Sequence, residues 1–145
     1  MQTETMATYM GLSVNEVERL LALPPAAIYD DPAYQAVVNQ LDADVLRQTL
    51  GHVRAVYDKG LAPIKAKYGL SNTIMSGFTL GNWVLGYLTT PDHLNNMLDR
   101  HAALPREVIA AALPELVALL DDLPAGRGEW QRALVTFSLP LIAGG

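Results

Sequence analysis

His93, Met97 and His101 follow one another at intervals of four residues, which places them along one face of a helix. Imidazole and thioether groups in such a row are ligands that copper and haem iron accept. One helix cannot complete a coordination sphere, however, and His52 is the only other histidine. Met97 and His101 also fall on the apolar stripe of their helix, so packing explains the row better. We predict no metal site and no cofactor.

Paired carboxylates could serve general acid–base catalysis, and three such pairs occur: Asp30–Asp31, Asp42 with Asp44, and Asp121–Asp122. Each pair stands at an expected helix end, where capping and the helix dipole already favour acidic side chains. The chain has no cysteine, and neither Ser76 nor Ser138 lies in a Gly-x-Ser-x-Gly elbow. Di-iron and His-Glu-x-x-His signatures are also absent. We therefore predict no catalytic residues and lean away from an enzyme.

Gly77 and Gly81 form a Gly-x-x-x-Gly step in a predicted helix over residues 73–88. Glycine costs a helix interior about 1 kcal/mol relative to alanine, so the pattern indicates that something approaches this helix closely. Three neighbours stay open: another helix of the same core, a protein partner or second copy, and a flat apolar ligand. Six residues form the candidate partner- or ligand-binding set: Gly77, Phe78, Gly81, Trp83, Tyr87 and His101.

The elements that must position these residues are all helical. Helix-start signals occur at Ser13, Asp31-Pro32, Asp42 or Asp44, Ser71, Thr90-Pro91 and Pro105. The longest apolar stripe runs from Leu46 to Tyr68 in steps of three or four, and Gly69 stands where a left-handed C-terminal cap belongs.

Prolines should interrupt several of these helices. We expect Gly60 and Pro63 to bend or split the long helix, and Pro114 to kink or divide the helix that follows Pro105. The last helix should begin at about Glu129 and end at Pro140. The tail over residues 133–145 is almost free of polar groups, so it must pack on its own domain, enter a partner or serve as a substrate.

Composition places these helices in one domain. The chain has 145 residues, of which 50% are apolar and 17% are charged, and no linker divides it. We predict an all-α, single-domain bundle of about six or seven short helices over residues 1–145, with 1–10 and 140–145 as candidate frayed ends. So apolar a chain leaves little polar surface for a monomer, which favours a homodimer or a complex with a protein partner.

Charge and hydropathy exclude other classes of partner. The net charge of −5 disfavours nucleic acid, whose phosphates need a basic patch. Residues 12–28 are similar to the start of a helix-turn-helix, but the next helix, over 26–34, has no Arg or Lys and carries Asp30 and Asp31. No apolar run reaches the roughly 20 residues of a membrane helix, and no secretory signal is visible. We expect a cytoplasmic protein that is not transmembrane.

Three functional hypotheses remain. The first is a non-enzymatic binding protein that contacts a partner or itself through the helix of Gly77, Gly81 and Trp83. The second is a carrier or sensor of an apolar or haem-like small molecule held between helices near Gly77, Gly81 and His101. The third, with the weakest support, is a small lyase or isomerase whose site uses Tyr57, His52 or Arg47 of the long helix.

Overall fold

The computed structural model describes residues 1–71, 81 and 106–143. These residues form seven α-helices and one 3-10 helix, without a strand among them, which confirms the predicted all-α class. The elements are α1 (Thr3–Met10), α2 (Val14–Leu21), α3 (Pro25–Ile28), α4 (Pro32–Asn39), α5 (Ala43–Lys67), α8 (Arg106–Leu119), η1 (Leu120–Asp122) and α9 (Arg127–Ile142). The predicted helix that starts at Thr90-Pro91 lies outside the described residues.

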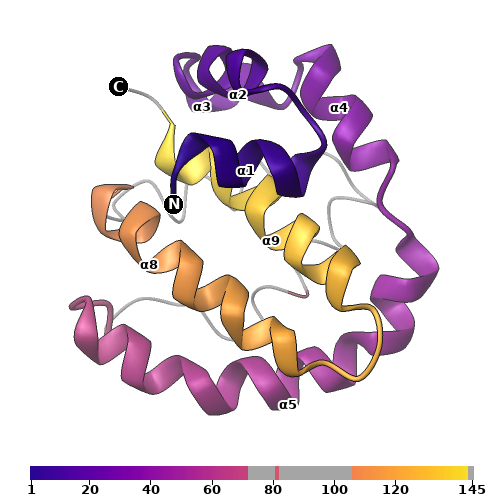
Figure 1. Ribbon diagram of the computed structural model, residues 1–145, viewed down its shortest axis with the longest axis vertical. Coiled ribbons are helices and arrows are strands. Elements are labelled where there is room, and N and C mark those ends of the chain that lie inside the picture. The colour runs from indigo at the N-terminus through magenta and orange to yellow at the C-terminus, as the bar shows by residue number, and fades with distance from the viewer. Residues whose placement is uncertain (72–80, 82–105, 144–145) are drawn as a thin grey trace.

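Helix α9 is the centre of the bundle. It contacts α8 on one side and α1 on another, and α2, α3, α4 and α5 also reach it (Figure 1). Every residue of α9 from Ala133 to Pro140 is buried, including the polar Thr136 and Ser138. The apolar C-terminal segment is therefore packed inside its own domain as far as Ala143, because contacts on all sides remove its side chains from water.

The capping residues expected from the sequence begin and end these helices. Ser13 Oγ accepts from the Glu16 amide at 3.2 Å, and Asp42 Oδ1 accepts from the amides of Asp44 and Val45. Gly69 has φ +70° and ends α5, as predicted for a left-handed cap. At α2, α4 and α5, side chains thus satisfy amide groups that the first turn of the helix leaves unpaired.

Of the bends or divisions expected at the internal prolines Pro63 and Pro114, the divisions do not occur. Helix α5 continues through Pro63, α8 through Pro114, and α9 through Pro140 to Ile142. The expectation that Pro140 ends the last helix was wrong, whereas the expected start at about Glu129 lies two residues from the observed start at Arg127. Each proline leaves the carbonyl four residues earlier without its helical donor.

Other donors replace two of those missing amides. The hydroxyl of Tyr34 in α4 donates to the Thr136 carbonyl at 3.1 Å, which is the acceptor that Pro140 leaves free. The amino group of Met1 donates to the Ala110 carbonyl, which is the one that Pro114 leaves free. A buried carbonyl with a new donor costs the helix little, so both helices continue.

Residues 1–10, considered as a candidate frayed end, contain helix α1. Met6 and Met10 on this helix are fully buried, and α1 packs against α2 and α9. Arg132 of α9 holds the end of α1 in place: its Nη2 donates to the Met10 carbonyl at 3.4 Å and to Gln40 Oε1 at 2.5 Å. Both acceptors lie at helix C-termini, where a cation is favoured by the helix dipole.

Candidate functional site

Of the six predicted binding residues, the structure describes Gly81. Gly81 is buried and helical, and a Cβ atom placed on it would lie 2.5 Å from Leu50 Cδ1 of α5. The close neighbour at this position is therefore the protein's own α5, which favours the core-packing interpretation for Gly81. The other five predicted residues lie outside the described part of the chain: Gly77, Phe78, Trp83, Tyr87 and His101.

The residues considered for catalysis on α5 do not come together. Arg47 and His52 are exposed, whereas Tyr57 is buried in the core. Burial raises the pKa of the Tyr57 hydroxyl above its ordinary value, with a smaller contribution from the charge of Asp58. Tyr57 is thus held in its protonated form and away from the exposed pair, so this geometry gives no support to the lyase or isomerase hypothesis.

The acidic pairs have structural partners. Asp42 caps α5, and Asp31 caps α4 while it also binds Arg19. Asp121 Oδ1 accepts from Gln131 Nε2 at 2.6 Å, which ties η1 to α9. Within residues 1–71, 81 and 106–143, no group of three or more His, Cys, Asp or Glu side chains could hold a metal ion.

A polar cluster of Lys67, Tyr68 and Glu115 connects the C-terminal end of α5 to α8. Lys67 Nζ lies 3.0 Å from Glu115 Oε1, and the hydroxyl of Tyr68 donates to the same carboxylate. The hydrogen bond from Tyr68, and after it the bond from Lys67, hold the pKa of Glu115 below its usual range. The same hydrogen bond to Glu115 raises the pKa of Tyr68. The ionised Glu115 carboxylate and the protonated Tyr68 hydroxyl are thus both hydrogen-bonded, and these bonds connect the end of α5 to α8.

The most unusual surface of the described residues is the turn between α2 and α4. Residues Leu20–Ile28 are nine consecutive residues without one polar side chain. Only the first and last of them, Leu20 and Ile28, are buried. Four of the others are exposed (Ala22, Pro24, Ala26 and Ala27), and three are half-buried (Leu21, Leu23 and Pro25). We call Leu20–Ile28 the apolar corner.

Backbone hydrogen bonds and two prolines restrain the backbone of the apolar corner. The amide of Leu23 donates to the Leu20 carbonyl at 3.1 Å, and the amide of Ala27 donates to the Pro24 carbonyl at 2.9 Å. Two consecutive prolines, Pro24 and Pro25, fix their own φ angles between these bonds. The corner therefore loses little conformational entropy when a partner covers it.

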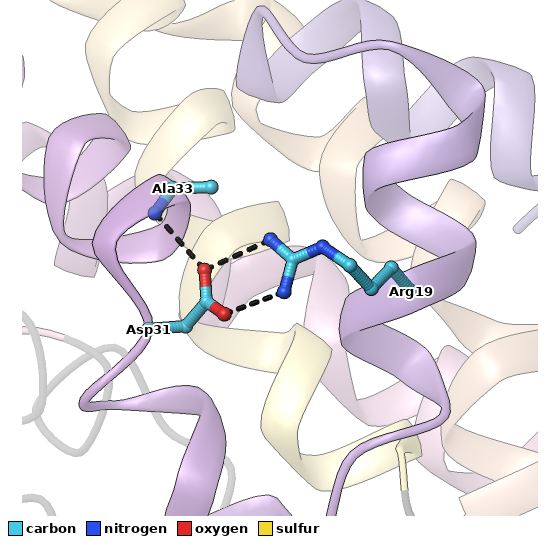
Figure 2. Close-up of polar contacts among 3 residues, drawn as sticks. All are labelled: Arg19, Asp31 and Ala33. Carbon is cyan, nitrogen blue, oxygen red and sulfur yellow. Dashed lines mark hydrogen bonds and ion pairs between the residues drawn. The ribbon is translucent and has the colours of Figure 1, made fainter.

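An ion pair connects the two residues that flank the apolar corner, Arg19 before it and Asp31 after it. Arg19 on α2 makes two parallel bonds to Asp31, with Nη1 to Oδ2 at 2.6 Å and Nη2 to Oδ1 at 3.0 Å (Figure 2). Asp31 Oδ1 also accepts from the Ala33 amide at 2.9 Å and so caps α4. The Asp31 side chain is only 11% exposed against 49% for Arg19. This two-bond geometry fixes where α4 starts relative to α2.

The electrostatics of the corner follow from that pair. Its hydrogen bonds with Arg19, assisted by the Ala33 amide, hold the pKa of Asp31 below its ordinary value, so Asp31 is ionised at neutral pH. Arg19 and Asp31 cancel one another's charge. Glu18 and Asp30, next to them in the sequence, are exposed acids at the two edges of the corner. We call Glu18, Arg19, Asp30 and Asp31 the rim of the apolar corner. Because Arg19 and Asp31 cancel, the rim carries a net negative charge from Glu18 and Asp30.

The sequence contained a signal for this site. The nine-residue apolar run is visible by inspection, and we interpreted it as part of a helix-turn-helix pattern that lacks the charge to bind DNA. The structure confirms the helix start predicted at Asp31 and Pro32, which begin α4, and places a separate single turn, α3, before it. What the sequence did not show is that most of the run lies at the surface.

Comparison with protein-family models, with curated proteins and with solved structures finds no match for this chain. Among the described helices, none combines the length and the apolar character that crossing a bilayer would require. The apolar corner and its acidic rim are the features of the described residues that point to a binding function.

Proposed function

We propose that this chain is a non-enzymatic interaction protein and that the apolar corner is a surface with which it binds a protein partner. The observation that carries the proposal is a run of seven apolar residues, 21–27, on a restrained turn with a charged rim; four of the seven are exposed and three are half-buried. Interfaces have this anatomy, with an apolar centre that excludes water and a polar edge that sets orientation.

The rigidity of the corner supports the same proposal. Flexible loops lose conformational entropy when they bind, whereas this turn is already fixed by the Arg19–Asp31 pair and by its own backbone bonds. Its two half-buried leucines, Leu21 and Leu23, pack partly on the core and leave the remainder of their side chains for a partner. The ion pair, the backbone hydrogen bonds and the packing of the two leucines thus hold this surface in place before a partner binds.

The helix that contains Gly77, Gly81 and Trp83 remains a proposed second contact surface, and a homodimer remains a proposed form of the complex. At Gly81, the contact with Leu50 favours packing within the chain. A carrier of an apolar or haem-like molecule would use His101, and it is the alternative function. A cytoplasmic location is part of the proposal on the sequence pattern alone.

Native mass spectrometry of the protein, released gently from the cells that make it, tests the proposed function. Wild type should carry a second polypeptide. The variant Ala26→Gln, which puts a bulky side chain on the exposed corner, should lose it, and Ala55→Gln, at an exposed position of α5, should keep it. A second copy would give twice the chain mass, and a bound small molecule would indicate the carrier. Equal retention by Ala26→Gln and wild type contradicts the proposal.

A further inference from the structure

The charges around the apolar corner narrow the class of partner. Glu18 precedes Leu21 by three residues and Ala22 by four, so its carboxylate lies on the same side of α2 as the start of the corner. Asp30 follows the other end of the corner after Ile28 and Tyr29. Both side chains are exposed, and neither has a hydrogen bond or an ion pair within the described residues.

Among the described residues, Arg19 is the cation at this rim, and it is already paired. Asp31 binds Arg19 through two hydrogen bonds, one of them 2.6 Å long. The two opposite charges cancel, so this ion pair adds no net charge to the rim. Glu16, on the same helix, accepts from the hydroxyl of Ser13 at the α2 cap. The neighbouring helix α1 adds the exposed acid Glu4 and carries no Lys or Arg. The edge of the corner is therefore acidic from several elements.

We propose that the apolar corner binds an apolar polypeptide segment flanked by Lys or Arg, such as one face of a basic amphipathic helix. This inference rests on the proposed function and specifies the partner. Apolar side chains of the segment would cover residues 21–27, while its cations would face Glu18 and Asp30. Opposite charges at a rim steer association and fix the register of the partner.

The same charges argue against the other occupants. A second copy seated on this corner would bring Glu18 and Asp30 close to their own counterparts, and like charges that face one another across an interface are unfavourable. An anionic lipid surface and nucleic acid are repelled for the same reason. A basic segment gains from the rim what each of these alternatives loses.

The probe is a pair of synthetic 15-residue helical peptides with the same leucine face, one with lysine on the polar face and the other with glutamate. Each is titrated into the isotope-labelled full chain, and backbone amide shifts are followed by NMR. The lysine peptide should shift amides within residues 18–31 and bind at least tenfold more tightly than the glutamate peptide. Its affinity should fall with added salt, because the rim is exposed.

Two charge variants separate the rim from the overall charge. Glu18→Lys combined with Asp30→Lys should weaken lysine-peptide binding about tenfold or more, as expected for the loss of two favourable rim charges. Glu107→Lys combined with Asp122→Lys makes the same change of net charge at exposed sites of α8 and η1, beyond the corner, and should leave affinity within about twofold.

Equal binding of the two peptides at the corner would overturn the inference that the partner is basic, while the proposed function would stand. Shifts outside residues 18–31, or no shift with either peptide, also overturn it. The native mass experiment then decides independently whether the corner binds another protein at all. Equal weakening by the two double variants would contradict a role for the rim.

Discussion

The hydroxyl of Tyr34 donates to the Thr136 carbonyl in the middle of the buried helix α9. The two residues are 102 positions apart, and the bond supplies the donor that Pro140 cannot provide. Both residues are fully buried, so no water is at hand to take the place of the hydroxyl. This bond explains how an apolar helix with an internal proline remains the centre of the bundle.

Tyr34→Phe should destabilise the fold by about 1–3 kcal/mol, because it leaves a buried carbonyl without a donor. In a Pro140→Ala background the same substitution should cost much less, since the alanine amide can donate to Thr136 as in an ordinary helix. Urea denaturation of the two single variants and the double variant measures this coupling. Equal cost of Tyr34→Phe in the two backgrounds would show that Tyr34 does not compensate for the proline.

Gly126→Ala should destabilise the protein by more than about 2 kcal/mol, from a strained backbone and from overpacking. Gly126 has φ +72°, and a Cβ atom there would lie 2.8 Å from Thr49 Oγ1. Thr49 Oγ1 itself accepts from Trp130 Nε1 at 2.7 Å, so it cannot move freely. Thermal and chemical unfolding measure the cost.

Gly128→Ala is the matched control, two residues after Gly126 and in the first turn of α9. It has no atom within 4 Å of the added Cβ and no positive φ, so alanine should be neutral or stabilise by about 0.5–1 kcal/mol. A small effect of Gly126→Ala, similar to that of Gly128→Ala, would mean that the start of α9 is not fixed against α5.

Gly81→Leu should destabilise the isolated chain by about 1–3 kcal/mol, because the new side chain meets Leu50 in a buried contact. Leu50→Ala should relieve part of that cost, so the double variant should be more stable than the sum of the single changes. Denaturant unfolding of the purified chain provides the measurement. Normal stability of Gly81→Leu, with no coupling to Leu50, would instead return Gly81 to the surface available for a partner.

Asp31 should make folding stability depend on pH in the acid range. The pKa of Asp31 is lower in the folded protein than in the unfolded chain, whose value is about 3.9, so the unfolded chain binds more protons as pH falls. The stabilisation is complete above the unfolded pKa and is lost as pH falls through the folded pKa. Asp31→Asn should remove this part of the dependence.

The measurement is the free energy of unfolding of wild type and Asp31→Asn from pH 6 to about pH 2, where carboxylates titrate. The two curves should converge as the pH falls. Arg19→Met is a second variant, which should lose the same portion because the Arg19 hydrogen bond is the largest cause of the shift. Curves for wild type and Asp31→Asn that run parallel across this range would contradict the role assigned to the ion pair.

Local signals made much of the fold predictable. Ser13, Asp31 and Gly69 act through hydrogen bonds or backbone angles within a few residues, so their roles can be inferred from neighbouring positions. The interruption expected at Pro140 was wrong for the opposite reason. Its compensation comes from Tyr34, and no local pattern shows that a distant hydroxyl will reach the freed carbonyl.

The candidate site was predictable only in part. The nine-residue run was visible in the sequence, but a run of Leu, Ala and Pro reads equally well as buried core. Its exposure is set by tertiary packing, and the Arg19–Asp31 bonds that flank it join residues 12 positions apart. The predicted set around Gly81 followed from the cost of helical glycine, and at Gly81 the close neighbour is Leu50.

Position-specific photo-crosslinking in the cells that make the protein tests the central claim most directly. A benzoylphenylalanine placed at Ala26, on the apolar corner, is compared with one at Ala55, at an exposed position of α5. We predict a discrete adduct at Ala26, heavier than the chain, that Ala55 does not give and that Glu18→Lys with Asp30→Lys weakens. Absence of an adduct at Ala26, or the same adduct from both positions, would contradict the apolar corner as the binding surface.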